Sequence, residues 1–447
     1  MTAPSEKLEA HVDFLVIGGG MAGMTAAARA AKAGRRVMVV EKAPDIGGSA
    51  VLSGGKLWTA ATLAMMAEEC PGGDAALQRK VFDRFESTAA WLRSTGITVE
   101  PESRHLHYGR GYNFDVVGYI AACRMLVEGH GGYIIRGAFV TELIKRSGCV
   151  VGARVADRDG ITTVHAPAVL LASGGFSASP ELLRSFVHFN ADKALARSNQ
   201  YSVGDGMRLG LAAGGSLSAN MGGFYGHVMQ SPVLKWGPRE YRAYTQGGSI
   251  KGLLLNQSGQ RFCDESLGDH QNAQRILEQP NAKVLLVFDQ AVREAEAQTI
   301  LANTDKPIDK VAIALDEGGR VAIAETWRAV FEKSVAWGFA ADQCLATVEA
   351  YNKGGATQPG RVRDLYPYLK PPFYALETQC GVTATHGGLR VDDRARVLDG
   401  DGGAVGGLFA AGADAGNIYG GGYAGGLSFA ATFGLLSAEE VLVLTSP

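Results

Sequence analysis

The chain has 447 residues, of which 46% are hydrophobic and 20% charged, as is typical of a globular protein with more than one domain. Its formal net charge of −2 gives no reason to expect a nucleic-acid partner. The six cysteines are scattered without a C-x-x-C pair, which argues against zinc, iron–sulfur and haem attachment and fits a reducing compartment.

Residues 1–14 are polar and lack the apolar core of a signal peptide. We expect no run of the ~20 apolar residues that a membrane span needs, and therefore a cytoplasmic protein. The 60 glycines cluster in pairs and triplets beside apolar runs, which predicts tight turns and close ligand contacts instead of a flexible linker.

The first predicted elements are a strand, a helix and a second strand, at residues 14–17, 24–33 and 37–40. The turn after the first strand carries glycines in the spacing G-x-G-x-x-G, which are Gly18, Gly20 and Gly23. These glycines allow a tight turn, close approach of the backbone to a pyrophosphate, and close packing of helix on strand. Glu41 ends the second strand, where its carboxylate can accept hydrogen bonds from a ribose. The pattern predicts a site for NAD or FAD, the alternative being an ordinary βαβ unit without a ligand.

Helices and strands then alternate up to about residue 213. Expected helices lie at 74–94, 116–128 and 204–213, expected strands at 133–135, 140–144 and 168–172, and an expected loop at 101–113. The middle of the chain has no dinucleotide-type turn and carries charged helices at 324–337 and 341–352. The last part contains an apolar strand at 408–411, a Gly-rich loop and a helix at 426–444.

This order predicts an α/β fold with an inserted domain of α+β type. A Rossmann-like dinucleotide-binding domain is expected from residues 1–225 and 373–447, and an inserted cap domain from residues 226–372.

Several longer motifs occur in a fixed order along the chain. They are GGGMAG, VVEKAPDIGGSAVLSGGKLW, ASGG at 172–175, GDGMRLGLAAGG at 204–215, NQSGQRFCDES at 256–266, and THGGLRVDDRARVL with LFAAGADAGNIYGGGYAGGLSFAATFG. In these motifs the chain resembles the fumarate reductase/succinate dehydrogenase flavoprotein superfamily, which includes the 3-ketosteroid dehydrogenases, over nearly its whole length. The resemblance implies an FAD domain made from both chain ends, with substrate bound where the cap meets it.

The resemblance also implies how FAD is held. Members that bind FAD covalently carry a histidine in the loop after the ribose acid, and residues 45–58 contain none, so non-covalent FAD is expected. A helix beginning near Gly426 would direct N–H groups at the pyrimidine edge of the flavin. The residues assigned to FAD are Gly18, Gly20, Met21, Ala22, Gly23, Glu41, Lys42, Gly48, Ser49, Ser53, Gly54, Gly55, Val140, Ala172, Ser173, Gly174, Asp205, Gly412, Ala413, Asp414, Gly426, Leu427, Ser428 and Phe429.

Three departures from the fumarate reductases bear on the substrate. Their proton-donor arginine aligns with Gly248, their carboxylate-binding histidine with Ala384, and a second arginine with Tyr423. The absence of these three groups argues against a dicarboxylate substrate. Tyr423 instead resembles the tyrosine that ketosteroid dehydrogenases place in a Y-x-G loop, where its hydroxyl and a backbone N–H bind the substrate carbonyl. The alternative is that Tyr423 only packs within the glycine loop and has no part in catalysis.

The expected reaction is α,β-dehydrogenation of a cyclic ketone or a 3-ketosteroid-like substrate. Polarising the ketone acidifies its α C–H, so that a base can remove the proton while the β hydrogen leaves as hydride to flavin N5. A short cap favours a small ring ketone. Candidates for the base or for a supporting role are Tyr108, Tyr112, Tyr225, Tyr244, Asp269, His270 and, near the flavin by resemblance, His386.

Two other functions stay open. An enone or enoate reductase of the fumarate reductase type would run the same chemistry in reverse. A non-redox binding protein could keep the Rossmann framework, although the Gly-rich loops at both chain ends argue against it. No second dinucleotide fingerprint occurs, which argues against direct use of NAD, so the unidentified electron acceptor is expected to be a quinone, oxygen or another protein. The sequence also does not fix the substrate or the oligomeric state.

Overall fold

The structure is a computed structural model that describes residues 8–298, 307–354 and 358–445. The chain divides into two compact units. Unit 1 comprises Met1–Ser179, Ser198–Gly223 and Ala384–Pro447, and unit 2 comprises Pro180–Arg197 and Phe224–Thr383. We describe each unit by itself.

The boundaries of unit 2 differ from the expected 226–372 at two places. Residues 180–197 belong to it, because β12 (Leu195–Ala196) pairs with β17 (Phe373–Thr385). Its last boundary lies after residue 383, because β17 also pairs with β15 (Lys283–Asp289) and β16 (Val321–Ala324). Because these strands pair in one sheet, β17 up to residue 383 belongs to unit 2.

Unit 1 is built on a sheet with the strand order β18-β19-β11-β2-β3-β7. The strands are β2 (Phe14–Ile17), β3 (Val37–Glu41), β7 (Tyr133–Arg136), β11 (Val169–Leu171), β18 (Arg396–Leu398) and β19 (Ala404–Ala410). All neighbours are parallel except β18 and β19. The carboxyl ends of β2, β3, β11 and β19 therefore meet at one edge, as ligand sites in open α/β sheets require. This confirms the Rossmann-like α/β fold.

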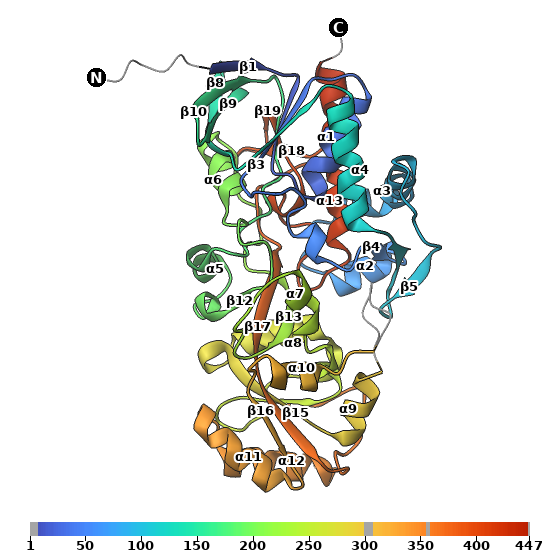
Figure 1. The fold of residues 1–447 in the computed structure, drawn as a ribbon, viewed down its shortest axis with the longest axis vertical. Coiled ribbons are helices and arrows are strands. Elements are labelled where there is room, and N and C mark those ends of the chain that lie inside the picture. Colours follow the sequence, from blue (N-terminus) through green and yellow to red (C-terminus); the bar gives the residue numbers. More distant parts are fainter. Residues whose placement is uncertain (1–7, 299–306, 355–357, 446–447) are drawn as a thin grey trace, which may run out of the picture. The chain divides into compact units, whose positions relative to one another are not determined.

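The helices of unit 1 are α1 (Met21–Lys32), α2 (Leu63–Glu69), α3 (Ala75–Ser94), α4 (Val116–Gly129), α6 (Asp205–Ala212) and α13 (Gly426–Leu444). Helix α1 lies alongside both α4 and α13 (Figure 1). Its small side chains permit this close packing: a Cβ placed on Gly434 of α13 would lie only 2.5 Å from the carbonyl oxygen of Ala22.

Helix α13 is long and apolar enough to cross a membrane by length and composition, contrary to the sequence expectation. However, 67% of its most apolar stretch is buried, and it contacts α1, α3 and β4 (Lys56–Ala60). An apolar helix surrounded by its own fold is typical of a protein core. We therefore interpret α13 as the core helix of unit 1.

Two smaller sheets complete unit 1. One has the order β1-β10-β9-β8, with β1 (Leu8–His11), β8 (Phe139–Arg146), β9 (Cys149–Asp157) and β10 (Gly160–His165). The other has the order β4-β6-β5, with β5 (Ser103–His105) and β6 (Gly109–Asn113). The expectation of a loop at 101–113 is therefore wrong.

Tertiary packing explains this hairpin, since β6 reads GRGYN and has little intrinsic strand propensity. Its two glycines lie against Trp58 of β4: a Cβ on Gly109 would lie 2.8 Å from the Trp58 ring, and one on Gly111 2.5 Å from the Trp58 Cβ. The large side chain on one strand fills the space that the glycines leave on its neighbour.

Unit 2 contains a sheet of order β12-β17-β15-β14, in which β17 also pairs with β13 and β16. Its remaining strands are β13 (Phe224–Gln230) and β14 (Leu253–Leu255), and its helices are α5 (Pro180–Phe186), α7 (Pro238–Ala243), α8 (Asp269–Leu277), α9 (Gln290–Glu296), α10 (Lys310–Asp316), α11 (Trp327–Ser334) and α12 (Ala341–Asn352). The helix expected at 324–337 starts later, because β16 pairs with β17 and the Thr326 side chain caps α11.

Candidate functional site

The turn between β2 and α1 leaves backbone open for an anion. Helix α1 begins after Gly20 without a side-chain cap, so its first N–H groups have no partner from a capping residue. A Cβ on Gly20 would meet nothing within 4 Å, whereas one on Gly48 would lie 3.3 Å from the Gly20 Cα. Two glycine backbones thus line the space in front of the helix, where a diphosphate binds best.

The other two fingerprint glycines are required by packing. Gly18 has a φ of +111°, and a Cβ there would lie 2.2 Å from the Ala172 carbonyl oxygen. A Cβ on Gly23 would lie 1.9 Å from the Gly18 carbonyl oxygen. Any larger residue at either position would separate β2 from β11 or α1 from β2. Met21 and Ala22 are buried in the first turn of α1 and position its backbone.

Glu41 lies at the end of β3 with its carboxylate fixed by the backbone. Its two oxygens accept hydrogen bonds of 2.7 Å from the N–H groups of Gly19 and Ala43. A carboxylate has about four lone-pair sites, so acceptor capacity remains for ribose hydroxyls. The N–H of Ala138 donates to the Glu41 carbonyl oxygen, which brings the start of β8, with buried Val140, beside it.

Asp414 joins two of the predicted cofactor loops to each other. Its carboxylate accepts hydrogen bonds from the N–H groups of Ser173 and Gly175 and, at 3.2 Å, from the Ser173 hydroxyl. Burial raises the pKa of Asp414, and these donors oppose the rise. The residue therefore holds the 173–175 loop to the 412–414 turn, and Ala413 lies in the same turn, 3.0 Å from a Cβ on Gly175.

The loop around Ser173 continues to the start of α6. The Gly206 N–H donates to the Ser173 hydroxyl at 2.9 Å. Asp205, the first residue of α6, forms an ion pair of 2.5 Å with Lys42, which follows Glu41. The structure thus brings together two residues that the sequence assigned to FAD separately.

The loop before β4 is held by short-range hydrogen bonds. The Ser53 hydroxyl donates to the Ala50 carbonyl at 2.7 Å and accepts from the Gly55 N–H, with Gly54 between them. The Ser49 hydroxyl accepts from the Asn199 N–H at 3.0 Å. These serines shape the loop and leave its backbone as the surface that a ligand would meet.

The N-cap residue of α13 is Gly425, which has no side chain to cap the helix. Gly425 has a φ of +102°, and a Cβ there would lie 2.0 Å from the Trp58 carbonyl oxygen. The Ser428 hydroxyl donates to that same oxygen at 2.6 Å, so Ser428 attaches the helix to β4. Leu427 is half-buried in the same turn and Phe429 is buried against Tyr419.

Tyr423 lies at this helix terminus. Its hydroxyl accepts a hydrogen bond of 2.5 Å from the N–H of Gly426, the first residue of α13. Its ring lies parallel to the buried His386 ring, with 6.5 Å between centroids and 7° between planes, and edge-on to Trp58. The Tyr108 hydroxyl donates to the Tyr423 carbonyl oxygen at 2.6 Å. Tyr108 and His386 are thus gathered around Tyr423.

Tyr112 contacts a different set of residues from those around Tyr423. Its hydroxyl donates to Glu86 at 2.8 Å, its ring stacks on Phe85 of α3, and the Arg93 guanidinium lies 4.6 Å from the ring centre. Burial and the Glu86 charge raise the pKa of Tyr112. These contacts give it a packing role between β6 and α3.

Unit 2 contains a carboxylate–imidazole pair. Asp269, the first residue of α8, accepts a hydrogen bond from Nδ1 of His227 on β13 at 2.5 Å, while its other oxygen accepts from the Val228 N–H at 3.0 Å. Burial lowers the pKa of His227, and the Asp269 charge opposes this. Tyr225 lies edge-on to His227, with ring centroids 4.8 Å apart.

This arrangement fixes the orientation of the imidazole and leaves its Nε2 to exchange a proton. His227 was missed by the sequence reasoning. The signal available was the strand period: Tyr225 and His227 are two residues apart on β13, so they lie on one face. His270 also lies near Tyr225, and burial lowers its pKa to about 4.

Two further features of unit 2 concern charged side chains. Arg261 and Glu265 form a buried ion pair of 2.6 Å within unit 2, which is a structural role. Gly248 lines a small cavity of ≈ 30 Å³ with Glu296 and Lys310, and a Cβ on Gly248 would lie 2.9 Å from the Glu296 side chain. A carboxylate therefore stands beside the position where fumarate reductases are expected to carry an arginine.

The residues of unit 1 fit an FAD molecule. The uncapped start of α1, with the open space at Gly20, would hold the pyrophosphate, and Glu41 the ribose. The glycine-rich loops at 47–55 and 420–426 would contact the ring system, and the start of α13, whose N-cap residue Gly425 has no capping side chain, would lie at its polar edge. No large side chain occupies the Gly20 position that such a ligand needs.

Comparison with known families decides the assignment. The family model described as FAD binding domain matches residues 13–88 and 99–429. The chain belongs to this family. It is an FAD-dependent oxidoreductase of the fumarate reductase/succinate dehydrogenase flavoprotein superfamily, as the resemblance implied.

Curated relatives in this family are 25–28% identical to the chain. The NADH:acrylate oxidoreductase of Vibrio harveyi is 25% identical over 98% of the chain, which spans 51% of that relative's length. The fumarate reductase (cytochrome) of Shewanella frigidimarina is 28% identical, covering 96% of the chain and 76% of the relative. The 4-oxocyclohexanecarboxylate 2-dehydrogenase of Sinomonas cyclohexanicum is 25% identical, covering 92% and 89%.

Solved structures share the fold. A 3-ketosteroid Δ1-dehydrogenase from Sterolibacterium denitrificans superposes with a TM-score of 0.78 at 18% identity, covering 97% of this chain and all of that one. An open conformation of a flavocytochrome c3 fumarate reductase superposes with a TM-score of 0.76 at 22% identity, covering 98% of this chain and 78% of that one.

Proposed function

We propose that the protein dehydrogenates a small cyclic ketone, introducing a C=C bond beside the carbonyl group. The observation that carries this proposal is Tyr423: a phenol in contact with the first N–H of α13, in a glycine loop of the FAD-binding unit. The similarity to a 4-oxocyclohexanecarboxylate dehydrogenase over 92% of the chain supports it, because the substrate in that name is a ring ketone.

In this proposal Tyr423 binds the carbonyl oxygen of the ketone. Its hydroxyl would donate to that oxygen, and its own acceptor bond from Gly426 at 2.5 Å polarises the hydroxyl and makes it a better donor. Negative charge that develops on the oxygen as the α proton leaves is thereby stabilised. When bound, FAD supplies the two-electron oxidation by accepting a hydride.

The proton acceptor is proposed to be the Asp269–His227 pair. The Asp269 carboxylate orients the ring through Nδ1, so that a neutral His227 keeps Nε2 available as a base. Tyr108 and His386 are proposed to position Tyr423, since one donates to its backbone carbonyl and the other lies parallel to its ring. Tyr112 is a weaker candidate because its hydroxyl is engaged by Glu86.

The proposal is tested by anaerobic mixing of the FAD-loaded protein with a cyclohexanone carboxylate, a 3-ketosteroid and succinate, with bleaching of the visible flavin band as the readout. Bleaching by the ring ketone, and not by succinate, is the expected result. Bleaching by succinate alone would overturn it, because it would show that a dicarboxylate binds without the arginine and histidine groups absent at Gly248, Ala384 and Tyr423.

An enoate or enone reductase is the second candidate function. The similarity to acrylate and fumarate reductases favours it. The same residues would act in reverse, with Tyr423 polarising the carbonyl of the acceptor and His227 returning a proton. Reoxidation of dithionite-reduced enzyme by 2-cyclohexenone, acrylate or fumarate, without bleaching of the oxidised enzyme by any saturated ketone, would favour this direction. We also propose that the protein is cytoplasmic and that it exchanges electrons with an unidentified partner.

A further inference from the structure

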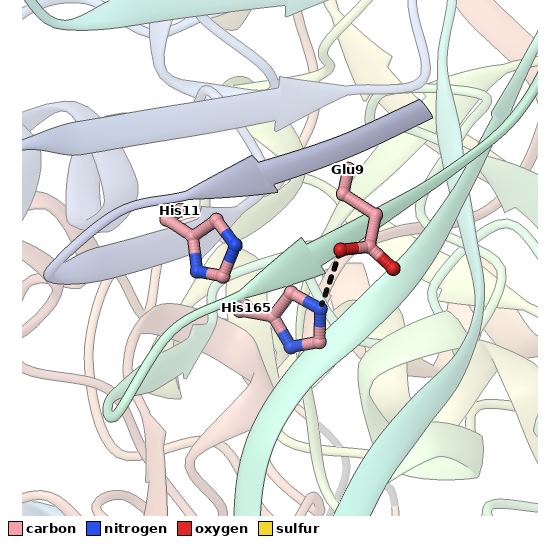
Figure 2. Close-up of side chains that lie close together, drawn as sticks. All are labelled: Glu9, His11 and His165. Carbon is pink, nitrogen blue, oxygen red and sulfur yellow. Dashed lines mark ion pairs between the residues drawn. The ribbon is translucent and has the colours of Figure 1, made fainter. Parts of the chain in front are cut away.

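Three side chains of types that can ligate a metal lie together in unit 1, away from the residues discussed so far. Glu9 and His11 are on β1, and His165 is the last residue of β10 (Figure 2). The two strands are parallel neighbours, with His11 opposite His165 and Glu9 opposite Thr163. Because side chains alternate along a strand, residues 9, 11 and 165 all project from one face of the sheet.

The ligand atoms are close enough for one ion. The two imidazole rings lie 4.7 Å apart and 19° from parallel, and Glu9 Oε2 lies 3.9 Å from His165 Nε2. One carboxylate oxygen and one nitrogen from each ring lie within 4.8 Å of one another. In the described part of the chain, neither imidazole forms a hydrogen bond, and Glu9 and His11 are exposed.

We propose that Glu9, His11 and His165 bind a divalent transition metal, with Zn²⁺ as the ion that this set suits best. Two imidazoles and one carboxylate are ligands that zinc prefers, at bond lengths of about 2.0–2.2 Å. Ligand atoms on such an ion lie roughly 3.5 Å apart, so the three side chains need to approach by only about 1 Å, which rotation of exposed side chains provides. Three protein ligands leave one position of a tetrahedron for water.

The site is structural rather than part of the redox centre. Strand β1 leads through Val12 and Asp13 into the amino end of β2, and β10 leads into the amino end of β11. The residues assigned to FAD follow the carboxyl ends of those strands, beginning at Gly18 and Ala172. A metal at residues 9, 11 and 165 would therefore link β1 to β10 at the opposite end of the central sheet and would stabilise the terminal strand of its own sheet.

The test uses FAD-loaded full-length protein treated with EDTA and titrated with Zn²⁺ against a chromophoric chelator. We expect one tight equivalent per chain, lost in the double variant His11→Ala/His165→Ala and weakened about tenfold or more in Glu9→Gln. His130→Ala is the matched control. His130 is an exposed histidine of the same unit, and its ring is hydrogen-bonded to the Leu126 carbonyl oxygen. Mg²⁺ should not compete, since it prefers oxygen ligands.

A second measurement is independent of affinity. Co²⁺ bound to two nitrogens and an oxygen in a tetrahedral site should give visible absorption bands that His11→Ala removes. The metal-free double variant should melt like the metal-free wild type and keep its flavin spectrum, which shows that it folds. Absence of a stoichiometric zinc equivalent, or equal binding by the wild type and the folded double variant, would overturn the proposal.

Discussion

At the scale of single residues, Tyr423 combines two properties that a carbonyl-binding group needs. Its hydroxyl is fixed by the Gly426 N–H, and its ring is held between Trp58 and His386. A fixed donor costs no reorganisation when charge develops on a substrate oxygen.

Replacement of Tyr423 by phenylalanine should lower turnover with a ring ketone on the order of 10²-fold, as for loss of one oxyanion donor, while FAD stays bound. Steady-state kinetics and the flavin spectrum would measure both. Tyr133→Phe, at an exposed tyrosine of β7, is the control and should have wild-type activity. Unchanged turnover in Tyr423→Phe would contradict the role.

Replacement of Asp269 by asparagine should move the acid limb of the pH–rate profile to lower pH. The Asp269 charge and hydrogen bond raise the pKa of His227 against the lowering effect of burial, so removing the charge lowers that pKa further. Turnover should also fall, because the ring is no longer oriented. Asp316→Asn, at the exposed end of α10, should leave the profile in place. A profile that does not move in Asp269→Asn would exclude His227 as the titrating group.

Some site residues were predictable from the sequence and some were not. Gly18, Gly23 and Glu41 follow from a local motif, because one strand–turn–helix unit places them. The structural role of Asp414 was not predictable, since its partners lie more than 200 residues away in sequence at Ser173 and Gly175. His227 was missed because nothing local links it to Asp269.

At the scale of elements, turns in unit 1 depend on backbone that only glycine can supply. Gly18→Ala should destabilise the β2–α1 turn by about 1–3 kcal/mol or more, because it combines a φ of +111° with a Cβ 2.2 Å from the Ala172 oxygen. Loss of bound FAD and a lower melting temperature would be the measured results. Gly129→Ala, where a Cβ meets nothing within 4 Å at the end of α4, should be neutral. Equal FAD content in both variants would contradict the prediction.

Helices were more predictable than short strands. Helices α3, α4, α6, α12 and α13 lie where the apolar spacing and the turn residues indicated, because helical periodicity is local. Strands β5, β6 and β16 were missed, because each is defined by a partner strand and not by its own composition.

At the scale of the whole molecule, partly buried histidines in both units link stability to pH. Burial lowers the pKa of His105 in unit 1 and of His270 in unit 2 from 6.5 to about 4. The unfolded chain therefore binds protons in a range where the folded chain does not. The stability associated with neutral His105 and His270 is present above pH 6.5 and is lost as the pH falls towards 4.

Each histidine should contribute on the order of 1–3 kcal/mol to the free energy of unfolding, and this contribution is lost over this pH range. Thermal melts between pH 4 and 7 should therefore show a falling melting temperature, and the fall should be smaller in His270→Gln, which has no titrating ring. An equally steep fall in that variant would show that other groups dominate acid unfolding.

The discontinuity of unit 1 has a consequence for how the protein is made. Strand β19, which pairs with β11, and helix α13, which packs on α1, both come from the segment Ala384–Pro447. A ribosome synthesises all of unit 2 before it reaches that segment, so unit 2 can fold while unit 1 is still incomplete. The nascent chain must keep the apolar faces of β2 and β11 from aggregating throughout this interval. The residues proposed to hold FAD include the 412–414 turn and the start of α13, so we expect FAD to bind only after this last segment has been synthesised.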